Sequence, residues 1–328
     1  MTISAIIPAY RPHNIKECVL AIADSSYKPY EIILVDDNSQ ADYFKDIRQY
    51  CKIIKLDKHS GPARARNAGA RASNSELLCF IDSDVLVFED TLELIASIFR
   101  KDPEISAVQT ACIDRCSFGN FASQYQNLYF HFNTIRVKEK YLATIIGHCF
   151  AVRKKDFDLV GGFDEGIRGA SVEDGNFGLN LYKLNKKIYL DKGIKVQHKS
   201  CLSPLAVISK MFMKSSDKIY TLLKGGDIFK VNLDKTEHSK LKITAILMSL
   251  FFASSLIGAI FSPRLLIPSL FILMVYVCCS WKFVYFCFRK NGPIFAIRVA
   301  LFHYLNCLFA SFGIVYGLLR FFKYRFIK

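Results

Sequence analysis

Residues 77–84 read Leu-Leu-Cys-Phe-Ile-Asp-Ser-Asp, an apolar run that ends in an Asp-Ser-Asp triplet. The apolar run predicts a strand, and carboxylates just past a buried strand lose hydration unless a cation or hydrogen-bond donors stabilise them. A divalent metal that carries a diphosphate is the obvious ligand for such a pair. An isolated triplet of this kind is more often a solvated turn, so its meaning depends on the motifs around it.

Short apolar runs alternate with helical patterns from residue 3 to about residue 200. Strands that alternate with helices predict an α/β domain, with a mostly parallel sheet flanked by helices. Ligands of such sheets bind beyond the carboxyl ends of the strands, where Asp36, Asp37, Asp82 and Asp84 are expected. The predicted strands are 4–8, 31–35, 53–56 and 77–81, and the predicted helices are 14–25, 41–51 and 62–73.

The C-terminal part of the chain is apolar and basic. Residues 241–328 contain ten Lys or Arg and no Asp or Glu, so most of the net charge of +15 lies there. Nucleic acid is not an expected partner, because the remainder of the chain is only mildly basic. Stretches 243–261, 265–281 and 299–319 approach the roughly 20 residues that cross a bilayer. We expect about three transmembrane helices, the alternative being two crossings and a buried or re-entrant third stretch.

The sequence also predicts where the domains lie. Basic residues between the second and third apolar stretches favour the cytoplasm, which predicts a multi-pass cell-membrane protein with a cytoplasmic catalytic domain. The eleven cysteines include no CxxC pair, which favours reduced thiols.

Residues 205–224 have helical spacing with a separate lysine stripe, so this amphipathic helix lies either in the headgroup region or on the catalytic domain. The predicted domains are 1–204 (catalytic), 205–240 (interfacial helix and linker) and 241–328 (transmembrane).

Seven short segments follow one another in the N-terminal part of the chain. Together they resemble the family 2 glycosyltransferases, inverting enzymes of the Rossmann-like GT-A fold that use nucleotide-diphosphate sugars. Each segment alone is a weak signal, but the ordered set is specific, and it covers roughly residues 3–200. The segments are Ile6-Ile7-Pro8-Ala9-Tyr10, Val35-Asp36-Asp37-Asn38-Ser39, Gly61-Pro62-Ala63-Arg64-Ala65-Arg66-Asn67-Ala68-Gly69, Ile81-Asp82-Ser83-Asp84, Gly161-Gly162-Phe163-Asp164-Glu165, Glu173-Asp174 and Val196-Gln197-His198.

The resemblance implies a donor site. It assigns Pro8, Tyr10 and Asp37 to the nucleotide base, and a carboxylate is suited to accept the imide hydrogen of uracil. The alternative for Asp36 and Asp37 is a pair that caps the following helix near Ser39. One arginine of the Ala-Arg-Asn motif is expected to reach phosphate or sugar oxygens, and we favour Arg66 over Arg64.

The resemblance also implies a metal and a catalytic base. It places Asp82 near the ribose and Asp84 on Mg²⁺ or Mn²⁺, with His198 as a further metal ligand or a structural hydrogen-bonding group. In the Glu-Asp pair, Asp174 is the expected base and Glu173 the second candidate.

Four residues are candidates for the acceptor side. They are Gly147, His148, Asp164 and Glu173. Asn176 and Asn180 depart from the family pattern, which usually has an acidic residue and an arginine at these two places.

The predicted function is transfer of a single sugar from a UDP- or GDP-sugar to a lipid-linked or glycan acceptor, in polysaccharide or glycolipid biosynthesis. The Gln-x-x-Arg-Trp motif of processive relatives is not found, which favours single transfer. Alternatives are a polyprenyl-phosphate glycosyltransferase similar to dolichyl-phosphate-mannose synthase, and a non-catalytic GT-A membrane scaffold. A nucleotidyltransferase is disfavoured because its glycine-rich N-terminal loop is not found. A homo-oligomer is possible on this interpretation.

Overall fold

The chain divides into two units in the computed structural model, which describes residues 1–29, 31–40, 42–167, 171–225 and 237–326. Unit 1 contains residues 1–119 and 133–201, and unit 2 contains residues 120–132 and 202–328. The predicted linker after residue 224 lies mostly outside the described residues. The segment 120–132 joins unit 2 although it lies between two parts of unit 1 in the sequence.

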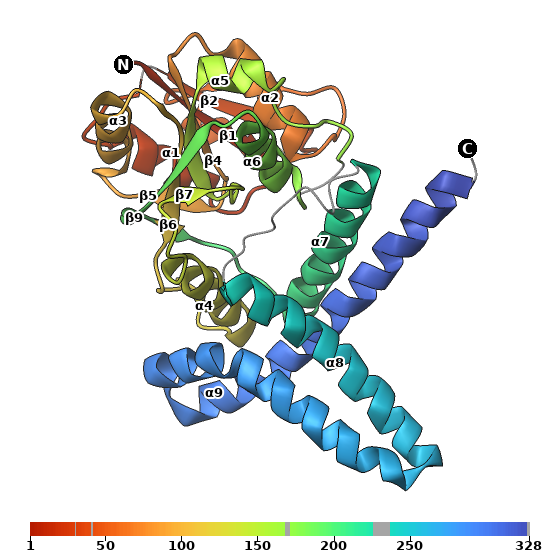
Figure 1. Cartoon of the computed structure of the whole chain (residues 1–328). Helices are drawn as coiled ribbons and strands as arrows, with labels where there is room; N and C mark the ends of the chain where they lie inside the picture. The colour runs from red at the N-terminus through yellow and green to blue at the C-terminus, as the bar shows by residue number, and fades with distance from the viewer. Residues whose placement is uncertain (30, 41, 168–170, 226–236, 327–328) are drawn as a thin grey trace. The chain divides into compact units, whose positions relative to one another are not determined.

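Unit 1 is an α/β domain whose helices alternate with strands (Figure 1). Its strands are β1 (Ile3–Ala9), β2 (Glu31–Asp36), β3 (Lys52–Lys55), β4 (Leu77–Ile81), β5 (Val85–Val87), β6 (Ile105–Cys112), β7 (Tyr141–Leu142), β8 (Cys149–Arg153) and β9 (Lys187–His198). Its helices are α1 (Ile15–Ala23), the 3-10 turn η1 (Lys45–Ile47), α2 (Pro62–Ala72), α3 (Thr91–Lys101), α5 (Lys154–Leu159) and α6 (Glu173–Lys183).

The sheet is parallel in its N-terminal half and mixed in the remainder. Its strand order is β3-β2-β1-β4-β8-β6-β9-β5, with β7 paired to β9. Strands β3, β2, β1 and β4 run parallel, whereas β8 is antiparallel to both β4 and β6. The prediction of a mostly parallel sheet therefore describes the first four strands and not the second half.

Helices cover both faces of this sheet. In β1, Ile3, Ala5 and Ile7 face the core formed with α1 and α3, whereas Ile6 faces the core formed with α2, α5 and α6. This alternation follows from the two-residue period of a strand. Because both sides are buried, the strand is apolar at nearly every position, as the sequence pattern indicates.

The expected helix over residues 41–51 is wrong in its extent. The structure has only the turn η1 within the described part of that range. Phe44 and Ile47 are the buried residues there, and they supply the apolar anchors of a single turn. The range therefore has too few core contacts to hold a longer helix.

Unit 2 is helical. It contains most of α4 (Phe121–Ile135), together with α7 (Pro204–Lys224), α8 (Glu237–Phe261), the 3-10 turn η2 (Pro263–Leu265) and α9 (Leu266–Phe326). Helix α9 contains a break at Gly292, whose φ of 83° lies in the left-handed region, and Pro293 begins the second half. Residues 240–261 and 263–326 form helices long and apolar enough to cross a membrane by length and composition.

Helix α7 packs along the second half of α9. A Cβ built at Gly317 would lie 2.4 Å from the backbone oxygen of Ser216, and one at Gly313 would lie 2.2 Å from that of Phe212. Small residues four positions apart allow two helix backbones to approach closely. Within unit 2, α9 is thus the packing partner of the amphipathic helix predicted over residues 205–224.

We expect Gly317→Leu to destabilise unit 2 by about 1–3 kcal/mol, the usual cost of overpacking, because the new side chain meets backbone that cannot move aside. The measurement is thermal unfolding of the full chain in detergent. Gly258→Leu is the matched control, since a Cβ there meets only the flexible end of Leu265. Equal unfolding midpoints for the two variants would contradict the close α7–α9 contact.

Candidate active site

The ends of three parallel strands bring the predicted donor residues to one edge of the sheet. Ala9 at the end of β1 pairs with Asp36 at the end of β2, and β1 is also paired with β4, which ends at Ile81. The residues that follow these strands are Tyr10, Asp37 and Asp82. Pro8 lies within β1 beside Val35. The carboxyl edge is the place where parallel α/β sheets bind ligands.

Asp36 and Asp37 are both buried and have different partners. Asp36 Oδ1 accepts from the Ser39 backbone N–H at 2.8 Å. This contact does not cap a helix, because the next helical turn, η1, begins at Lys45. Asp37 accepts from the backbone N–H groups of Ser60 (2.8 Å) and Gly61 (2.7 Å). The Asp37 carboxylate therefore fixes the loop that leads into α2.

His59 also belongs to this cluster. It lies outside the sequence motifs, so the sequence did not identify it as a site residue. Its Nδ1 lies 2.9 Å from Asp37 Oδ2, and its ring stacks on Tyr10 with 3.9 Å between ring centroids. Tyr10 is exposed, and the Arg11 guanidinium lies over its ring at 5.1 Å from the ring centroid. The structure thus forms an aromatic surface beside a carboxylate, a combination suited to a planar base.

Arg66 lies at the centre of a buried ion-pair network. Its guanidinium donates to Asp82 Oδ1 at 2.7 Å and to Glu173 Oε1 at 2.9 Å, and it lies over the Phe163 ring at 5.4 Å. Burial opposes its charge, but Asp82, Glu173 and Asp174 outweigh this effect and raise the pKa of Arg66. Arg66 therefore holds carboxylates from β4 and α6 together, and Arg64 on the same helix is only half-buried.

The Asp82 carboxyl shows the opposing forces in this network. Burial and the neighbouring charge of Asp84 raise its pKa, Arg66 lowers it, and the resulting pKa is about 7. Such perturbed carboxyls gather at functional sites.

Asp174 is held at the start of α6. Its Oδ2 accepts from the Gly147 backbone N–H at 2.5 Å, and its Oδ1 accepts from the Gly175 N–H at 2.7 Å. A Cβ at Gly147 would lie 3.1 Å from both Asp174 Oδ2 and Arg66 Nη2, so glycine allows the backbone to approach this pair. Asp174 and Gly147 are thus in direct contact, and Glu173 joins them through Arg66.

Asp84 and His198 are brought together from distant parts of the chain. Val85 pairs with His198 in the β5–β9 ladder, and His198 Nε2 lies 3.5 Å from Asp84 Oδ2. The His148 ring lies 4.8 Å from the His198 ring between centroids, and the His148 carbonyl accepts from the Asp82 N–H at 3.0 Å. The candidate metal pair is therefore adjacent to the Asp82 strand end and to the Gly147 turn.

These donors suit a divalent cation shared with a ligand. Within the described ranges, no group of three or more His, Cys, Asp or Glu forms a complete metal cage. Mg²⁺ and Mn²⁺ are commonly bound by one or two protein ligands and complete their shell with phosphate oxygens and water. A carboxylate and an imidazole at 3.5 Å fit this arrangement.

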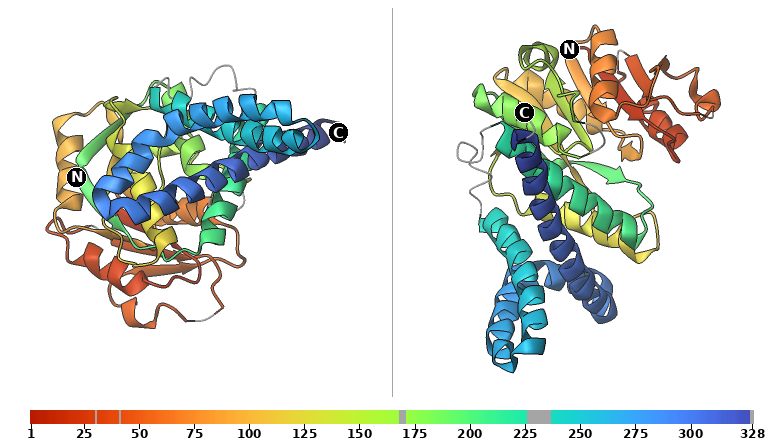
Figure 2. Two further views of the ribbon diagram at one scale, coloured as in Figure 1. Left: turned by 90° about the horizontal axis from the view of Figure 1, so that it is seen from below. Right: turned by 90° about the vertical axis from the view of Figure 1, so that its right-hand side faces the viewer.

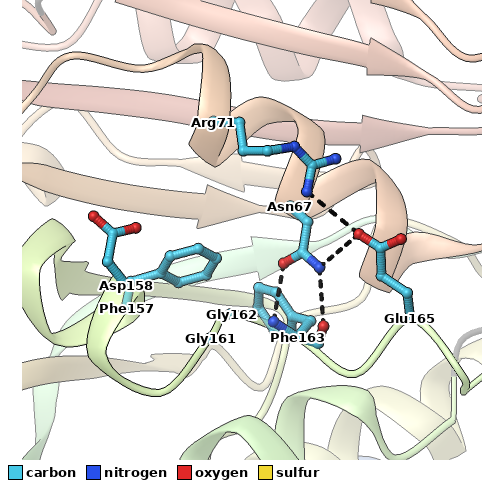
Figure 3. A pocket seen from close by; sticks show the side chains of 8 residues that line it. All are labelled: Asn67, Arg71, Phe157, Asp158, Gly161, Gly162, Phe163 and Glu165. Carbon is cyan, nitrogen blue, oxygen red and sulfur yellow. Dashed lines mark hydrogen bonds and ion pairs between the residues drawn. The ribbon is translucent and has the colours of Figure 1, made fainter.

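A pocket lies between α2 and the Gly-Gly-Phe-Asp-Glu segment (Figure 3). Its lining does not include Asp82, Asp84 or Asp174. Asn67 donates to the Phe163 carbonyl at 2.9 Å and accepts from the Phe163 N–H at 2.9 Å, and it also donates to Glu165. Asn67 of the Ala-Arg-Asn motif therefore ties this loop to α2. Asp164 is exposed and accepts from the Gly166 N–H, so its carboxylate is engaged within its own loop.

Solved structures share this architecture. A mannosyltransferase from Pyrobaculum calidifontis in complex with GDP-Man and Mn²⁺ aligns with 98% of this chain and 86% of its own, with a TM-score of 0.51 and 15% identity. The structure of GalNAc-T7 with UDP, GalNAc and Mn²⁺ aligns with 62% of this chain and 44% of its own, with a TM-score of 0.50 and 16% identity. These likenesses define the fold as GT-A, as predicted.

The sequence comparison identifies the family. Residues 4–161 match the family described as Glycosyl transferase family 2, so this part of the chain is a family 2 glycosyltransferase domain. A curated relative, an uncharacterized glycosyltransferase of Haemophilus influenzae, is 26% identical over 200 residues, which are 57% of this chain and 66% of the relative. Glycosyltransferase GlyG of Streptococcus pneumoniae is 31% identical over 31% of this chain and 37% of its own. The chain therefore spans two thirds or less of these relatives' lengths.

Proposed function

We propose that this protein is a membrane-anchored inverting glycosyltransferase that transfers one sugar from a nucleotide-diphosphate sugar at the cytoplasmic face. The observation that carries the proposal is the convergence of Asp82 and Asp174 on Arg66 and the Gly147 turn, with Asp84 paired to His198 just after the same strand end. Asp82 and Asp84 lie within the residues that match family 2, and Asp174 lies beyond them at the start of α6. The convergence gives one site both a donor-binding carboxylate group and a candidate base.

The donor is a UDP- or GDP-sugar in this proposal. Tyr10, His59 and Asp37 receive the nucleotide base, because a ring surface and a carboxylate acceptor are adjacent there. Asp84 and His198 hold Mg²⁺ or Mn²⁺ together with the diphosphate. When bound, the metal stabilises negative charge on the departing diphosphate.

Inversion requires one carboxylate on the acceptor side. Asp174 takes the proton of the acceptor hydroxyl as its oxygen forms a bond to the anomeric carbon. The bond between that carbon and the diphosphate oxygen breaks on the opposite side, and the nucleoside diphosphate leaves. Arg66 holds Glu173 and Asp82 in place through its two hydrogen bonds, while the Gly147 N–H orients Asp174.

The acceptor in this proposal is a lipid-linked glycan or a polyprenyl phosphate. The apolar helices of unit 2 support it, because a membrane anchor brings the enzyme to an acceptor that is itself in the membrane. The test is a panel of UDP- and GDP-sugars with membrane lipid extract and the full chain, read by released nucleoside diphosphate. Release from no donor, with a folded protein, would support a non-catalytic scaffold.

We expect EDTA to abolish donor turnover and Asp84→Ala to weaken the apparent affinity for Mn²⁺ at least ~10-fold, because even groups that only orient a metal ligand contribute this much. Titration of turnover with Mn²⁺ measures the effect, and His198→Ala is expected to shift the same curve. Asp90→Ala is the matched control, since Asp90 is an exposed carboxylate of the same domain. Full turnover in EDTA would refute the metal assignment.

A further inference from the structure

The second half of α9, residues 293–326, is held by two helices that adjoin unit 1 in the sequence. One face of it is buried in unit 2 and carries small or polar residues, among them His303, Asn306, Ala310, Gly313 and Gly317. The other helices of this contact are α4 and α7. This arrangement bears directly on how many times the chain crosses the membrane.

Helix α7 fixes the end of α9. Arg320 donates to Ser216 Oγ at 3.0 Å and to Asp217 Oδ1 at 2.6 Å. Contacts step from Phe212 with Gly313 to Ser216 with Gly317, so the two helices run parallel. The last turns of α9 therefore lie beside a helix whose exposed side chains include Lys210, Lys214, Lys218 and Lys224.

Helix α4 fixes the beginning of the same half. Tyr125 Oη lies 2.8 Å from His303 Nδ1 and accepts from Asn306 Nδ2 at 3.0 Å. The start of α4 is in turn joined to the segment before α7, because Leu202 N–H donates to Ser123 Oγ at 2.8 Å. Both ends of segment 120–132 continue directly into unit 1, so His303 lies on the same side of a membrane as that unit.

This connectivity opposes a third crossing. A crossing by residues 293–326 would carry Gly313 to the far side, together with Phe212 of α7, which follows unit 1 closely in the sequence. Helix α7 would then place its lysines in the hydrocarbon region, where charged side chains are strongly unfavourable. The apolar length of the segment is sufficient for a crossing, but its packing partners are not compatible with one.

The opposite face of the same half forms an exposed apolar stripe. The stripe consists of Ile294, Ile297, Leu301, Leu305, Phe312 and Leu319. These positions fall on one side of a helix with 3.6 residues per turn. Exposed Arg298 and Lys323 lie near its two ends. An apolar stripe flanked by cations is typical of a helix that lies in the plane of an anionic lipid surface.

A hairpin supplies the crossings instead. Helix α8 and the first half of α9 project together from the other helices of unit 2 (Figures 1 and 2). The base of the hairpin lies at α4, because Lys242 lies over the Tyr129 ring and Phe283 packs against Tyr125. Arg264 is exposed at the tip, where a cation favours water or headgroups over hydrocarbon.

We propose that the chain crosses the membrane twice, through α8 and the first half of α9, and that residues 293–326 lie in the headgroup region on the side of unit 1. The C-terminus then lies on that same side, as its basic residues favour. The partner of the apolar stripe is an anionic lipid surface. This inference rests on the membrane anchoring in the proposed function.

The test places one protease-sensitive epitope tag in each of three full-length versions: before Met1, between Ser262 and Pro263, and after Lys328. Each is studied in sealed vesicles with the cytoplasmic face outward, and donor turnover checks that each version is folded. We expect the two terminal tags to be cut without detergent and the internal tag to be cut only after detergent is added. Protection of the C-terminal tag would overturn the proposal through a third crossing, and cleavage of the internal tag would overturn the crossing hairpin.

A second measurement examines the stripe. A photo-crosslinking residue replaces Leu301, and the same residue replaces the exposed Leu159 of unit 1 as the control. We expect lipid adducts at position 301 and few at position 159. Absence of adducts at 301 would overturn the interfacial placement. Recovery of the untagged chain in the soluble fraction would instead refute membrane anchoring itself, which separates failure of the proposed function from failure of this inference.

Discussion

Asp174→Asn is expected to lower turnover by roughly 10²–10⁴-fold, the contribution of a positioned general base, while donor binding stays near that of the native protein. Asparagine has nearly the same shape, and its remaining oxygen still accepts one of the two backbone N–H groups that Asp174 contacts. It cannot take a proton from the acceptor hydroxyl. Single-turnover kinetics and nucleotide-sugar binding, measured on the full chain, separate the two effects.

Two variants sharpen this test. Asp90→Asn removes an exposed carboxylate of the same domain and is expected to leave turnover nearly unchanged. Glu173→Gln examines the second candidate base. If Asp174→Asn turns over normally and Glu173→Gln does not, the base is Glu173. If Asp174→Asn loses donor binding as well, its carboxylate serves mainly to hold the Gly147 turn.

Arg66→Ala is expected to destabilise the protein by about 3–5 kcal/mol, because the substitution leaves the buried Glu173 and the partly buried Asp82 without their counter-charge. Asp82 and Glu173 both lose a hydrogen bond shorter than 3 Å in this variant. Chemical unfolding of the full chain in detergent measures the change, and activity is expected to fall with it. Arg64→Ala, two residues away on α2, is the matched control because Arg64 is only half-buried.

The origin of that loss is itself testable. If unpaired charge causes it, adding Asp82→Asn and Glu173→Gln to Arg66→Ala restores part of the stability although it does not restore turnover. If packing of the Arg66 side chain over Phe163 causes it, the triple variant remains as unstable as the single one. Native stability of Arg66→Ala alone would contradict the network.

The sequence predicts an element best where the same burial pattern continues through the whole segment. Residues 77–81 were predicted as a strand and form β4, because an unbroken apolar run between polar turns has few other structures available. The predicted helix over 41–51 forms only one 3-10 turn in its described part, because Phe44 and Ile47 are its buried residues. The mixed second half of the sheet was not predicted, because β8 inserts between β4 and β6 through pairings remote in the sequence.

The same contrast holds for the candidate site. The strand-end rule places Asp36, Asp37 and Asp82 at one edge without any coordinates. It does not reveal that His59 contacts both Tyr10 and Asp37, since a single histidine outside a motif gives no signal. The orientation of Arg66 between β4 and α6 likewise depends on tertiary packing.

Most of α4 belongs to unit 2, which has a practical consequence for the design of a shorter protein. Tyr125, Phe132 and their neighbours pack against Phe283 and Phe302 of α9, although they belong to a segment inserted within the catalytic domain. Trimming the chain after residue 204 would leave that aromatic patch in water, and contiguous apolar patches of this kind promote aggregation. A well-behaved fragment therefore needs polar replacements along α4, or it must keep the helices that shield it.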